Sequence, residues 1–442
     1  MKEAITKAMD IFKAGLLAVS PEKAVMNHLS VKNNTLAAGG LKIALSGFKQ
    51  IYVLGAGKAS AHMARALELL LEKQSLPWLG HVVVKDGHSV PLRHIKITEA
   101  AHPVPDYRGL EASESILSDL QNCGEETLVV SLMSGGGSSL LPCPAGALTL
   151  DDLKRATDLL LASGAGIHEI NSVRKHLSRV KGGLLARAAF PARVVNLMLS
   201  DVIGDSPGVI ASGPFSADIS TFETALAVIR NYGLEASMPH NLLEHLNTGA
   251  RGLLDETPKP GDPCFDRVDE WIIASNSLFL SEAQARAGKW GYHSMILSSS
   301  FSGEASQFAQ LFLSVAREIA ASGQPFQRPA CLLAGGELTV TVKGNGLGGR
   351  NQEAALAAVK NIAEIPGALF FSAGTDGTDG PTDAAGAWCE TNTLAKAKAA
   401  GLNPYDFLER NDSYHFFEPL NQLVRTGPTG TNVMDCYMLL ID

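Results

Sequence analysis

Short apolar runs alternate with amphipathic segments along most of the 442-residue chain. In the first half, runs rich in Val, Ile and Leu end in glycine or serine and lead into helical patterns of apolar positions. Continuously apolar strands separated by helices are typical of a parallel sheet covered on both faces. Strands are expected in this half at 51–54, 81–84, 127–133 and 193–199.

The second half repeats the alternation after a turn-forming segment at 257–263 that is rich in proline and glycine. Strands are expected here at 270–274, 294–297, 330–333, 337–342, 369–373 and 435–440. Alternating β-branched residues at 339–342 favour a mixed sheet. We therefore expect an α/β protein with a Rossmann-like domain over 1–262 and a smaller α/β domain over 263–442. Ligands of such folds bind beyond strand ends, here in the cleft between the domains.

Composition narrows the class of protein. Residues 1–20 carry apolar positions at helical spacing with charges between them, which predicts an amphipathic helix rather than a signal peptide. No apolar stretch approaches the roughly 18 residues of a membrane span. The net charge of −8 argues against nucleic-acid and anionic-membrane partners. Six cysteines without a CxxC pair indicate reduced, buried thiols in a cytoplasmic protein.

The glycine-rich turn 55–60 (GAGKAS) lies between a predicted strand and a predicted helix. Glycines there allow close approach to an anion, and Lys58 can neutralise phosphate charge. The turn is no P-loop, because Ala59 follows the lysine. It half-fits a dinucleotide fingerprint, but Asp86 lies some 30 residues on rather than about 20. The alternative is a structural turn with a solvated lysine.

The loop 134–139 (SGGGSS) follows the apolar strand 127–133. Three consecutive glycines expose backbone N–H groups, and the serine hydroxyls add donors, which is typical of a nest for phosphate oxygens. The alternative is a flexible linker.

A basic segment, 167–183, is expected to form one amphipathic helix. One face would guide an anionic ligand, with Asn171 and Lys175 four residues apart on it. The alternative is a solvated face. The basic residues are Arg174, Lys175, Arg179 and Lys181.

Asp201 lies two residues after the predicted strand 193–199, with Ser200 between them. A carboxylate in this position suits Mg²⁺, which favours one or two carboxylates plus phosphates, or a base toward a substrate hydroxyl. The alternative is that Asp201 or Asp205 caps a helix.

Two further polar segments follow strands of the second half. We expect 335–337 and 344–353 to form a strand pair and a loop in which Arg350 clamps an anion. An acid-rich turn at 374–383 suits a metal–nucleotide or a polyol, but not an EF-hand. The alternatives are a flexible hairpin and ordinary surface turns.

Taken in order, these segments resemble the class II glycerate 2-kinases, whose C-terminal part carries the MOFRL domain. The resemblance covers nearly the whole chain and rests on the following motifs: GAGKAS (55–60), HPVPD (102–106), SGGGSSLL (134–141), NSVRKHLSRVKGG (171–183), LSDVIGD (199–205), ASGPF (211–215), AGGELTVTVKGNGLGGRNQE (334–353) and SAGTDGTDGPTDAAGA (372–387). It implies a kinase that transfers the γ-phosphoryl group of ATP, with Mg²⁺, to the 2-hydroxyl of D-glycerate.

Carried over to this chain, the resemblance assigns catalytic roles to Lys58, Asp201 and Arg350, with Asp201 also a candidate Mg²⁺ ligand. The candidate substrate- and phosphate-binding residues are Gly57, Ser134, Gly135, Gly136, Gly137, Ser138, Ser139, Asn171, Lys175, Glu337, Asn345 and Asp376.

Two other functions stay open at this point. Similar proteins have been called hydroxypyruvate reductases, which would use NAD(P)H, and the half-fitting turn at 55–60 is the local support. A non-catalytic sugar-phosphate sensor would use the same loops without turnover. The expected partner is the small-molecule substrate alone, and the expected state is a monomer or homodimer.

Overall fold

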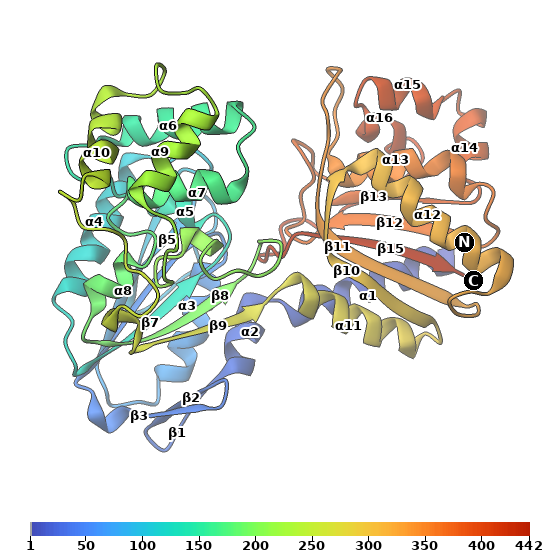
Figure 1. Cartoon of the computed structure of the whole chain (residues 1–442). Coiled ribbons are helices and arrows are strands. Elements are labelled where there is room, and N and C mark those ends of the chain that lie inside the picture. The colour runs from blue at the N-terminus through green and yellow to red at the C-terminus, as the bar shows by residue number, and fades with distance from the viewer. Residues whose placement is uncertain (1) are drawn as a thin grey trace. The chain divides into compact units, whose positions relative to one another are not determined.

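The computed structural model describes residues 2–442 and divides the chain into two compact units (Figure 1). The N-terminal unit comprises Pro21–Ile273. The C-terminal unit comprises Ala274–Asp442 together with Met1–Ser20.

A six-stranded sheet forms the centre of the N-terminal unit. Its strands are, in spatial order, β6 (Ile95–Ala100), β5 (Trp78–Lys85), β4 (Gln50–Ala56), β7 (Thr127–Met133), β8 (Arg193–Leu199) and β9 (Val268–Ala274). The pairs from β6 to β8 are parallel, as the alternating pattern predicts. Every residue of β7 is buried, which explains its uninterrupted apolar sequence.

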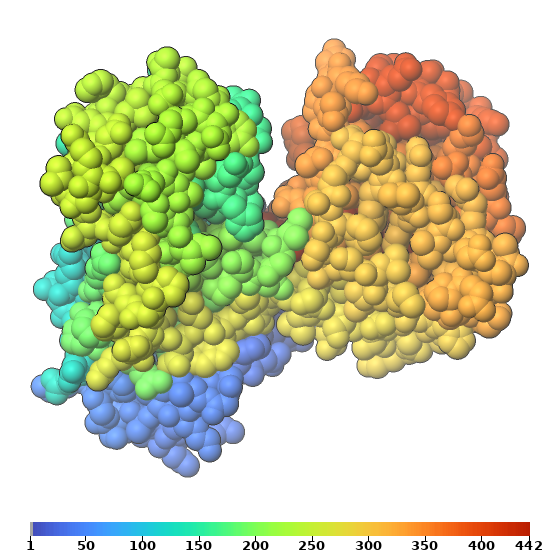
Figure 2. Space-filling view, in the orientation of Figure 1, coloured from blue at the N-terminus to red at the C-terminus, as the bar shows by residue number. Residues whose placement is uncertain are grey.

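Some helices of the N-terminal unit pack on this sheet, and others form a separate helical layer with its own apolar core. Those near the sheet are α3 (Ser60–Leu71), α4 (Tyr107–Gln121), α5 (Gly137–Leu140) and α8 (Leu184–Ala189). A separate apolar core joins the helical layer of α6 (Leu150–Ala162), α7 (Ile167–His176), α9 (Phe222–Asn231) and α10 (His240–Ala250). In the space-filling view, the yellow-green residues of α9 and α10 form the outer surface of this helical layer (Figure 2). The unit begins with α2 (Pro21–His28) and a small antiparallel sheet, β1 (Leu29–Lys32), β2 (Thr35–Ala38) and β3 (Leu41–Ala44).

The C-terminal unit has a mixed sheet, as expected. Its strands are, in spatial order, β10 (His293–Glu304), β11 (Ala330–Thr339), β15 (Asp435–Ile441), β12 (Ala368–Gly374), β13 (Gly386–Glu390) and β14 (Leu423–Val424). Only β10 and β11 pair in parallel among these described strands.

Helices lie on both faces of the mixed sheet (Figure 1). One face carries α12 (Ala305–Ser322) and α13 (Arg350–Ile362), and α14 (Thr393–Ala399), α15 (Pro404–Glu409) and α16 (Ser413–Phe417) lie beyond. The opposite face carries α1 (Lys2–Ala18) and α11 (Asn276–Lys289). The ring of Phe12 in α1 lies 5.5 Å from that of Phe279 and 5.2 Å from that of Phe371. The amphipathic first helix is therefore confirmed, and its apolar face packs within the C-terminal unit.

The structure differs from the expected domain division in two elements. Helix α1 belongs to the C-terminal unit, and β9 is an edge strand of the N-terminal sheet rather than the first strand of the second domain. Neither assignment can be made from local sequence, because each depends on a partner far away along the chain.

Two expected elements have different extents. The basic segment is helical only over Ile167–His176 and then turns, so the expectation of one helix to residue 183 is wrong. The expected strand 330–333 and the first residues of the expected strand 337–342 form the single strand β11, which ends at Thr339, so there is no strand pair at 335–337 and residues 340–342 are not in a strand. Glycines at 335 and 336 are compatible with an extended chain packed closely against neighbours.

The cysteines and the helix lengths bear on two expectations from composition. All six cysteines are buried free thiols. Among residues 2–442, every helix is too short or too polar to cross a lipid bilayer.

Candidate functional site

Three segments that carry candidate residues meet at one edge of the N-terminal sheet. The adjacent parallel strands β4, β7 and β8 end there and lead into Gly57–Lys58, the Ser134–Gly137 turn and Asp201, respectively. The carboxyl ends of parallel strands are the usual ligand-binding edge of such sheets. The order of the strands therefore brings together residues that are far apart in the sequence.

The turns after β4 and β7 are joined by main-chain and side-chain hydrogen bonds. The Ser134 N–H donates to the Ala56 carbonyl at 3.0 Å, and the Lys58 N–H donates to the Gly135 carbonyl at 2.9 Å. The Ala59 N–H donates to Ser134 Oγ at 3.1 Å. Ser134 thus fixes the main chain on both sides of Lys58.

Glycine is required at two places in these turns. Gly57 has a φ of +138°, and a Cβ there would overlap Ser134. A Cβ on Gly135 would overlap the carboxylate of Asp201. The bare backbone of the loop therefore lies against the Asp201 side chain, which the sequence pattern alone did not indicate.

Two histidines lie beside Lys58. His88 Nδ1 bonds the Lys58 carbonyl at 3.1 Å. Burial, followed by the Lys58 charge, lowers the pKa of His102 to about 4, so this imidazole is neutral at pH 7. His102 also faces Gly136, where a Cβ would come within 2.8 Å of its Nε2. Sequence reasoning did not select His102 as a site residue, although it lies in the HPVPD motif.

Asn171 and the loop share a hydrogen-bond chain through Ser212. Ser138 Oγ lies 2.8 Å from Ser212 Oγ, and Ser212 Oγ donates to Asn171 Oδ1 at 3.2 Å. Lys181 Nζ donates to the carbonyls of Ser138 at 2.5 Å and Leu141 at 3.2 Å. Ser212 and Lys181 were missed as site residues, although the ASGPF and VKGG segments contain them.

Lys175, in contrast, has an internal partner. Its Nζ lies 3.1 Å from Asp218 Oδ1, and both side chains are buried. Burial alone would raise the pKa of Asp218, but the Lys175 charge and hydrogen bonds from Ser220 hold it below its ordinary value. The alternative of a solvated basic face is therefore wrong for Lys175 and for the buried Lys181.

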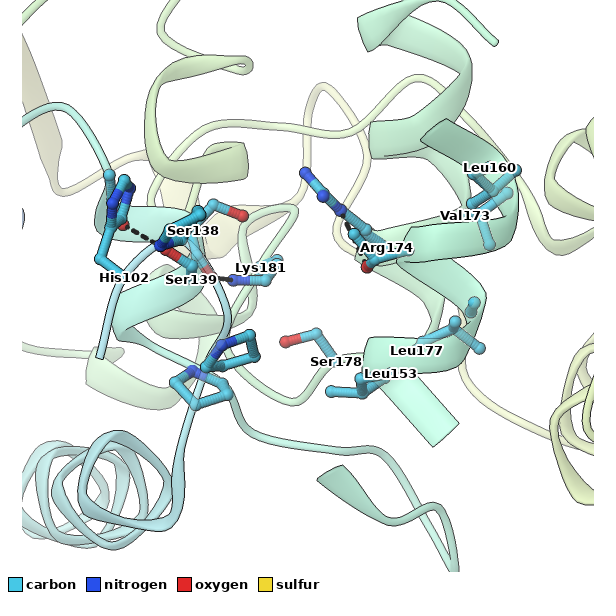
Figure 3. A pocket seen from close by; sticks show the side chains of 16 residues that line it. His102, Ser138, Ser139, Leu153, Leu160, Val173, Arg174, Leu177, Ser178 and Lys181 are labelled. Carbon is cyan, nitrogen blue, oxygen red and sulfur yellow. Dashed lines mark hydrogen bonds between the residues drawn. The ribbon is translucent and has the colours of Figure 1, made fainter. Parts of the chain in front are cut away.

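A cavity of about 270 Å³ opens beside the Ser-Gly loop, within the N-terminal unit (Figure 3). One wall is formed by His102 and the loop residues Gly136, Ser138 and Ser139. The opposite wall comes from α6, α7 and the residue after α7 and is mainly apolar, with Leu160, Val173 and Leu177 labelled in Figure 3. Arg174 and Lys181 extend into the space between these walls.

In the C-terminal unit, Arg350 forms a cluster with two acids. Its guanidinium binds Asp435 through Nε at 2.6 Å and Nη2 at 3.1 Å, and Glu337 through Nη1 at 2.6 Å. Burial lowers the pKa of Arg350, but Asp435 and Glu337 more than offset this and raise it. Within residues 2–442, three of the five N–H donors of the Arg350 guanidinium are thus engaged by acids, and the other two are not.

The acid-rich turn divides into separate roles. Asp379 is buried and accepts the N–H groups of Asn351 and Gln352 at the start of α13, at 3.1 and 2.8 Å. Asp383 pairs with Arg425 at 3.0 Å. Asp376 accepts the N–H and hydroxyl of Thr378, both at 3.0 Å. Asp379 therefore holds the end of the helix that carries Arg350.

The candidate residues thus fall into two groups. The N-terminal unit collects Gly57, Lys58, Ser134–Ser139, Asn171 and Asp201 around one sheet edge. The C-terminal unit holds Glu337 and Arg350 in one ion-pair cluster, Asp376 in a turn, and Asn345 exposed in the loop before α13.

A site made only of protein ligands for a metal ion is absent from residues 2–442, where no three His, Cys, Asp or Glu side chains converge suitably. Mg²⁺ bound with a nucleotide needs only one or two carboxylates plus phosphate oxygens. Asp201, beside the bare backbone of the Ser-Gly loop, fits that lesser requirement.

Comparison with known proteins gives matches over almost the whole chain. Residues 7–247 match a domain of unknown function (DUF4147), and residues 330–435 match the MOFRL family. The chain is 41% identical to a D-glycerate 2-kinase of Thermotoga maritima over 98% of this chain and 97% of that protein. It is 39% identical to a glycerate 2-kinase of Pyrococcus horikoshii over 98% of each chain.

Two further comparisons bear on the fold and on the rival function. The crystal structure of the Thermotoga maritima glycerate kinase superposes with a TM-score of 0.88 at 39% identity and covers 100% of both chains. A protein of Agrobacterium vitis described as a putative hydroxypyruvate reductase is 40% identical over 98% of this chain and 93% of its own length.

Proposed function

Because the chain belongs to the glycerate kinase family that carries the DUF4147 and MOFRL domains, we propose that it phosphorylates D-glycerate at the 2-hydroxyl with ATP. The products are 2-phospho-D-glycerate and ADP. One structural observation supports phosphoryl transfer above all. Lys58, the bare Ser-Gly loop and Asp201 lie together at the ends of three adjacent parallel strands.

The proposed roles follow from charge and position. Phosphoryl transfer depends mainly on positioning and on stabilising the charge of the transferred group, so no covalent nucleophile is needed. Lys58 neutralises charge on that group, and Asp201 orients the 2-hydroxyl or holds Mg²⁺. The N–H groups of the Ser-Gly loop bind phosphate oxygens. Mg²⁺ held there with the nucleotide would supply positive charge that offsets the negative charge of the phosphates.

Arg350 is proposed to use its two remaining N–H donors for the carboxylate of glycerate or for the transferred group. Glu337 and Asp435 hold its guanidinium in one orientation for that contact. Asn345 and Asp376 stay predicted binding residues, and Lys175 is better explained as the partner of Asp218. A cytoplasmic monomer or homodimer stays the expected state.

The rival reductase is less well supported by the same sheet edge. In a dinucleotide site, an acid at the end of the second strand binds the ribose. Asp86, just after β5, instead accepts two hydrogen bonds from the Arg108 guanidinium, at 2.7 and 2.9 Å. A kinase should release ADP only when D-glycerate is present. Oxidation of NADH by hydroxypyruvate without ATP would favour the reductase, and ligand binding without either reaction would favour the sensor.

A further inference from the structure

The cavity beside the Ser-Gly loop contains two cationic side chains and no acid. Its lining residues include Arg174 and Lys181 but neither Asp nor Glu. Among the residues that the structure describes, the Arg174 side chain forms one hydrogen bond, a long one of 3.4 Å from Nε to Thr157 Oγ1. Within the same part of the chain, Lys181 Nζ donates only to main-chain carbonyls. Within residues 2–442, neither side chain forms an ion pair with a carboxylate.

Such an arrangement is costly without a ligand. Burial lowers the pKa of Arg174, and burial with the Arg174 charge lowers the pKa of Lys181 to about 7. Removing a charge from water without an opposite charge is unfavourable, so buried cations in proteins are normally paired. The cavity is therefore suited to an anion that supplies the missing negative charge.

The other residues that line the cavity favour a ligand with an apolar part over a small anion that is polar throughout. Five aliphatic side chains from α6, from α7 and from the residue after α7 face the cavity: Leu153, Ala156, Leu160, Val173 and Leu177. Glycerate has polar groups on all three carbons, so burial against this wall would leave them without partners. A heteroaromatic base has apolar faces that match it. The volume of about 270 Å³ lies just below the range for whole small-molecule sites, about 300–1,000 Å³, so the cavity suits one part of a ligand.

The cavity and the strand-end site share one short stretch of backbone. Gly135 lies against Asp201, and its neighbour Gly136 lies against His102 in the cavity wall. A ligand with its base in the cavity can therefore extend a phosphate chain along the loop toward Asp201 and Lys58.

We propose that this cavity is the nucleotide subsite, with the base against α6 and α7 and the phosphates beside Arg174 and Lys181. The proposal rests on the proposed kinase function, because it names the place of the phosphoryl donor. It assigns the acceptor, glycerate, to the polar strand-end region instead. Arg174 and Lys181 belong to the basic segment expected to guide an anion, whereas a role in binding for the aliphatic wall was not indicated by the sequence.

The test compares three variants of the full-length protein, with ADP as the probe. Thr157→Phe fills the cavity from α6, Arg174→Met removes a cation from it, and Arg179→Met removes an exposed cation that does not line it. The first two should weaken ADP binding, measured calorimetrically, by about tenfold or more, the scale of one charge-assisted hydrogen bond or a blocked pocket. Arg179→Met should bind ADP like the wild type.

Steady-state kinetics give the second readout. The first two variants should raise the KM for ATP and leave the KM for D-glycerate within about twofold, a difference well below one hydrogen bond. A raised KM for D-glycerate with unchanged ADP affinity would assign the cavity to the acceptor and overturn the proposal. Unchanged KM values for ATP and D-glycerate, with unchanged ADP affinity, would also overturn the proposal, because the cavity would then bind neither ligand.

Two precautions keep the outcome interpretable. If Thr157→Phe does not fold, Leu153→Trp narrows the same cavity from a half-buried position and replaces it. A wild-type protein that binds ADP but transfers no phosphoryl group to glycerate would contradict the proposed function alone. The comparison of ADP affinities would still decide where the nucleotide binds.

Discussion

The backbone of Gly135 lies directly against the carboxylate of Asp201, with no room for a side chain between them. The contact joins the loop after β7 to the first residues after β8. It places a carboxylate beside the main-chain N–H groups proposed to bind phosphate. The spacing of a phosphate, its counter-ion and Asp201 would therefore depend on the absence of a Cβ at residue 135.

Gly135→Ala should reduce turnover by about a hundredfold, because displacement of a reacting group by about 1 Å has an effect of that size. The added methyl group must displace either Asp201 or the loop. Gly124→Ala is the matched control, since a Cβ there meets nothing within 4 Å. Turnover of both variants and their melting temperatures should be compared. Equal turnover in the two variants would show that the Gly135–Asp201 contact does not matter for catalysis.

Lys58→Ala should lower turnover by at least about a hundredfold, the usual effect of losing one preorganised charge partner, about 2.7–4 kcal/mol. The loss should appear in kcat, because the charge of the transferred group develops in the transition state. Lys96→Ala, at an exposed position on β6, serves as the control and should retain wild-type turnover. Near-normal kcat in Lys58→Ala would remove Lys58 from the mechanism.

Arg350→Met should lose both activity and stability. Asp435 is only 1% exposed, and removal of Arg350 leaves its carboxylate buried without this cation. Breaking a buried pair in this way costs about 3–5 kcal/mol. The double variant Arg350→Met/Asp435→Leu should recover part of the free energy of unfolding but no activity. Recovery of turnover in the double variant would contradict a role for Arg350 in binding.

Because the pKa of buried His81 is lowered, the free energy of unfolding should fall as the pH is lowered from 7 to 5. Burial, with the Lys96 charge adding to it, lowers the pKa of His81 to about 4, whereas an unfolded histidine titrates near 6.5. Between these values the unfolded chain binds a proton that the folded protein does not, so stability falls as the pH falls. The contribution at pH 5 is on the order of 1–2 kcal/mol.

The check is urea unfolding at pH 7 and pH 5 for the wild type and His81→Gln. The glutamine side chain can still bond Thr98, the partner of His81 Nε2 at 2.8 Å. The variant should lose less stability than the wild type over this interval. An identical loss in both proteins would show that His81 is not the group responsible.

Strands β7 and β8 agree with the sequence prediction at both ends, because each is an apolar run that ends at glycine or serine. Strand β9 could not be assigned in the same way. It follows the turn-forming segment 257–263, and only its pairing beside β8 places it in the first sheet. Local sequence specifies that a strand forms, but strand order depends on packing between distant segments.

The candidate site shows the same division. The glycines of 134–139 indicate a loop whose backbone packs closely against another group. They do not indicate that this group is the carboxylate of Asp201. The basic residues of 167–183 form one charge pattern in the sequence, but some of them are exposed in the structure and others are buried. Arg179 is exposed, whereas Lys181 is buried under the loop, and only the contacts with Ser138 and Leu141 distinguish them.

The most direct test of the proposed activity uses D-glycerate, ATP with Mg²⁺, and enolase, without phosphoglycerate mutase. Enolase acts on the 2-phosphate, so formation of phosphoenolpyruvate reports both the phosphoryl transfer and its position. The account predicts phosphoenolpyruvate in step with ADP. Phosphoenolpyruvate only after addition of the mutase would mean that the 3-hydroxyl is phosphorylated, and no ADP release at all would contradict the kinase assignment.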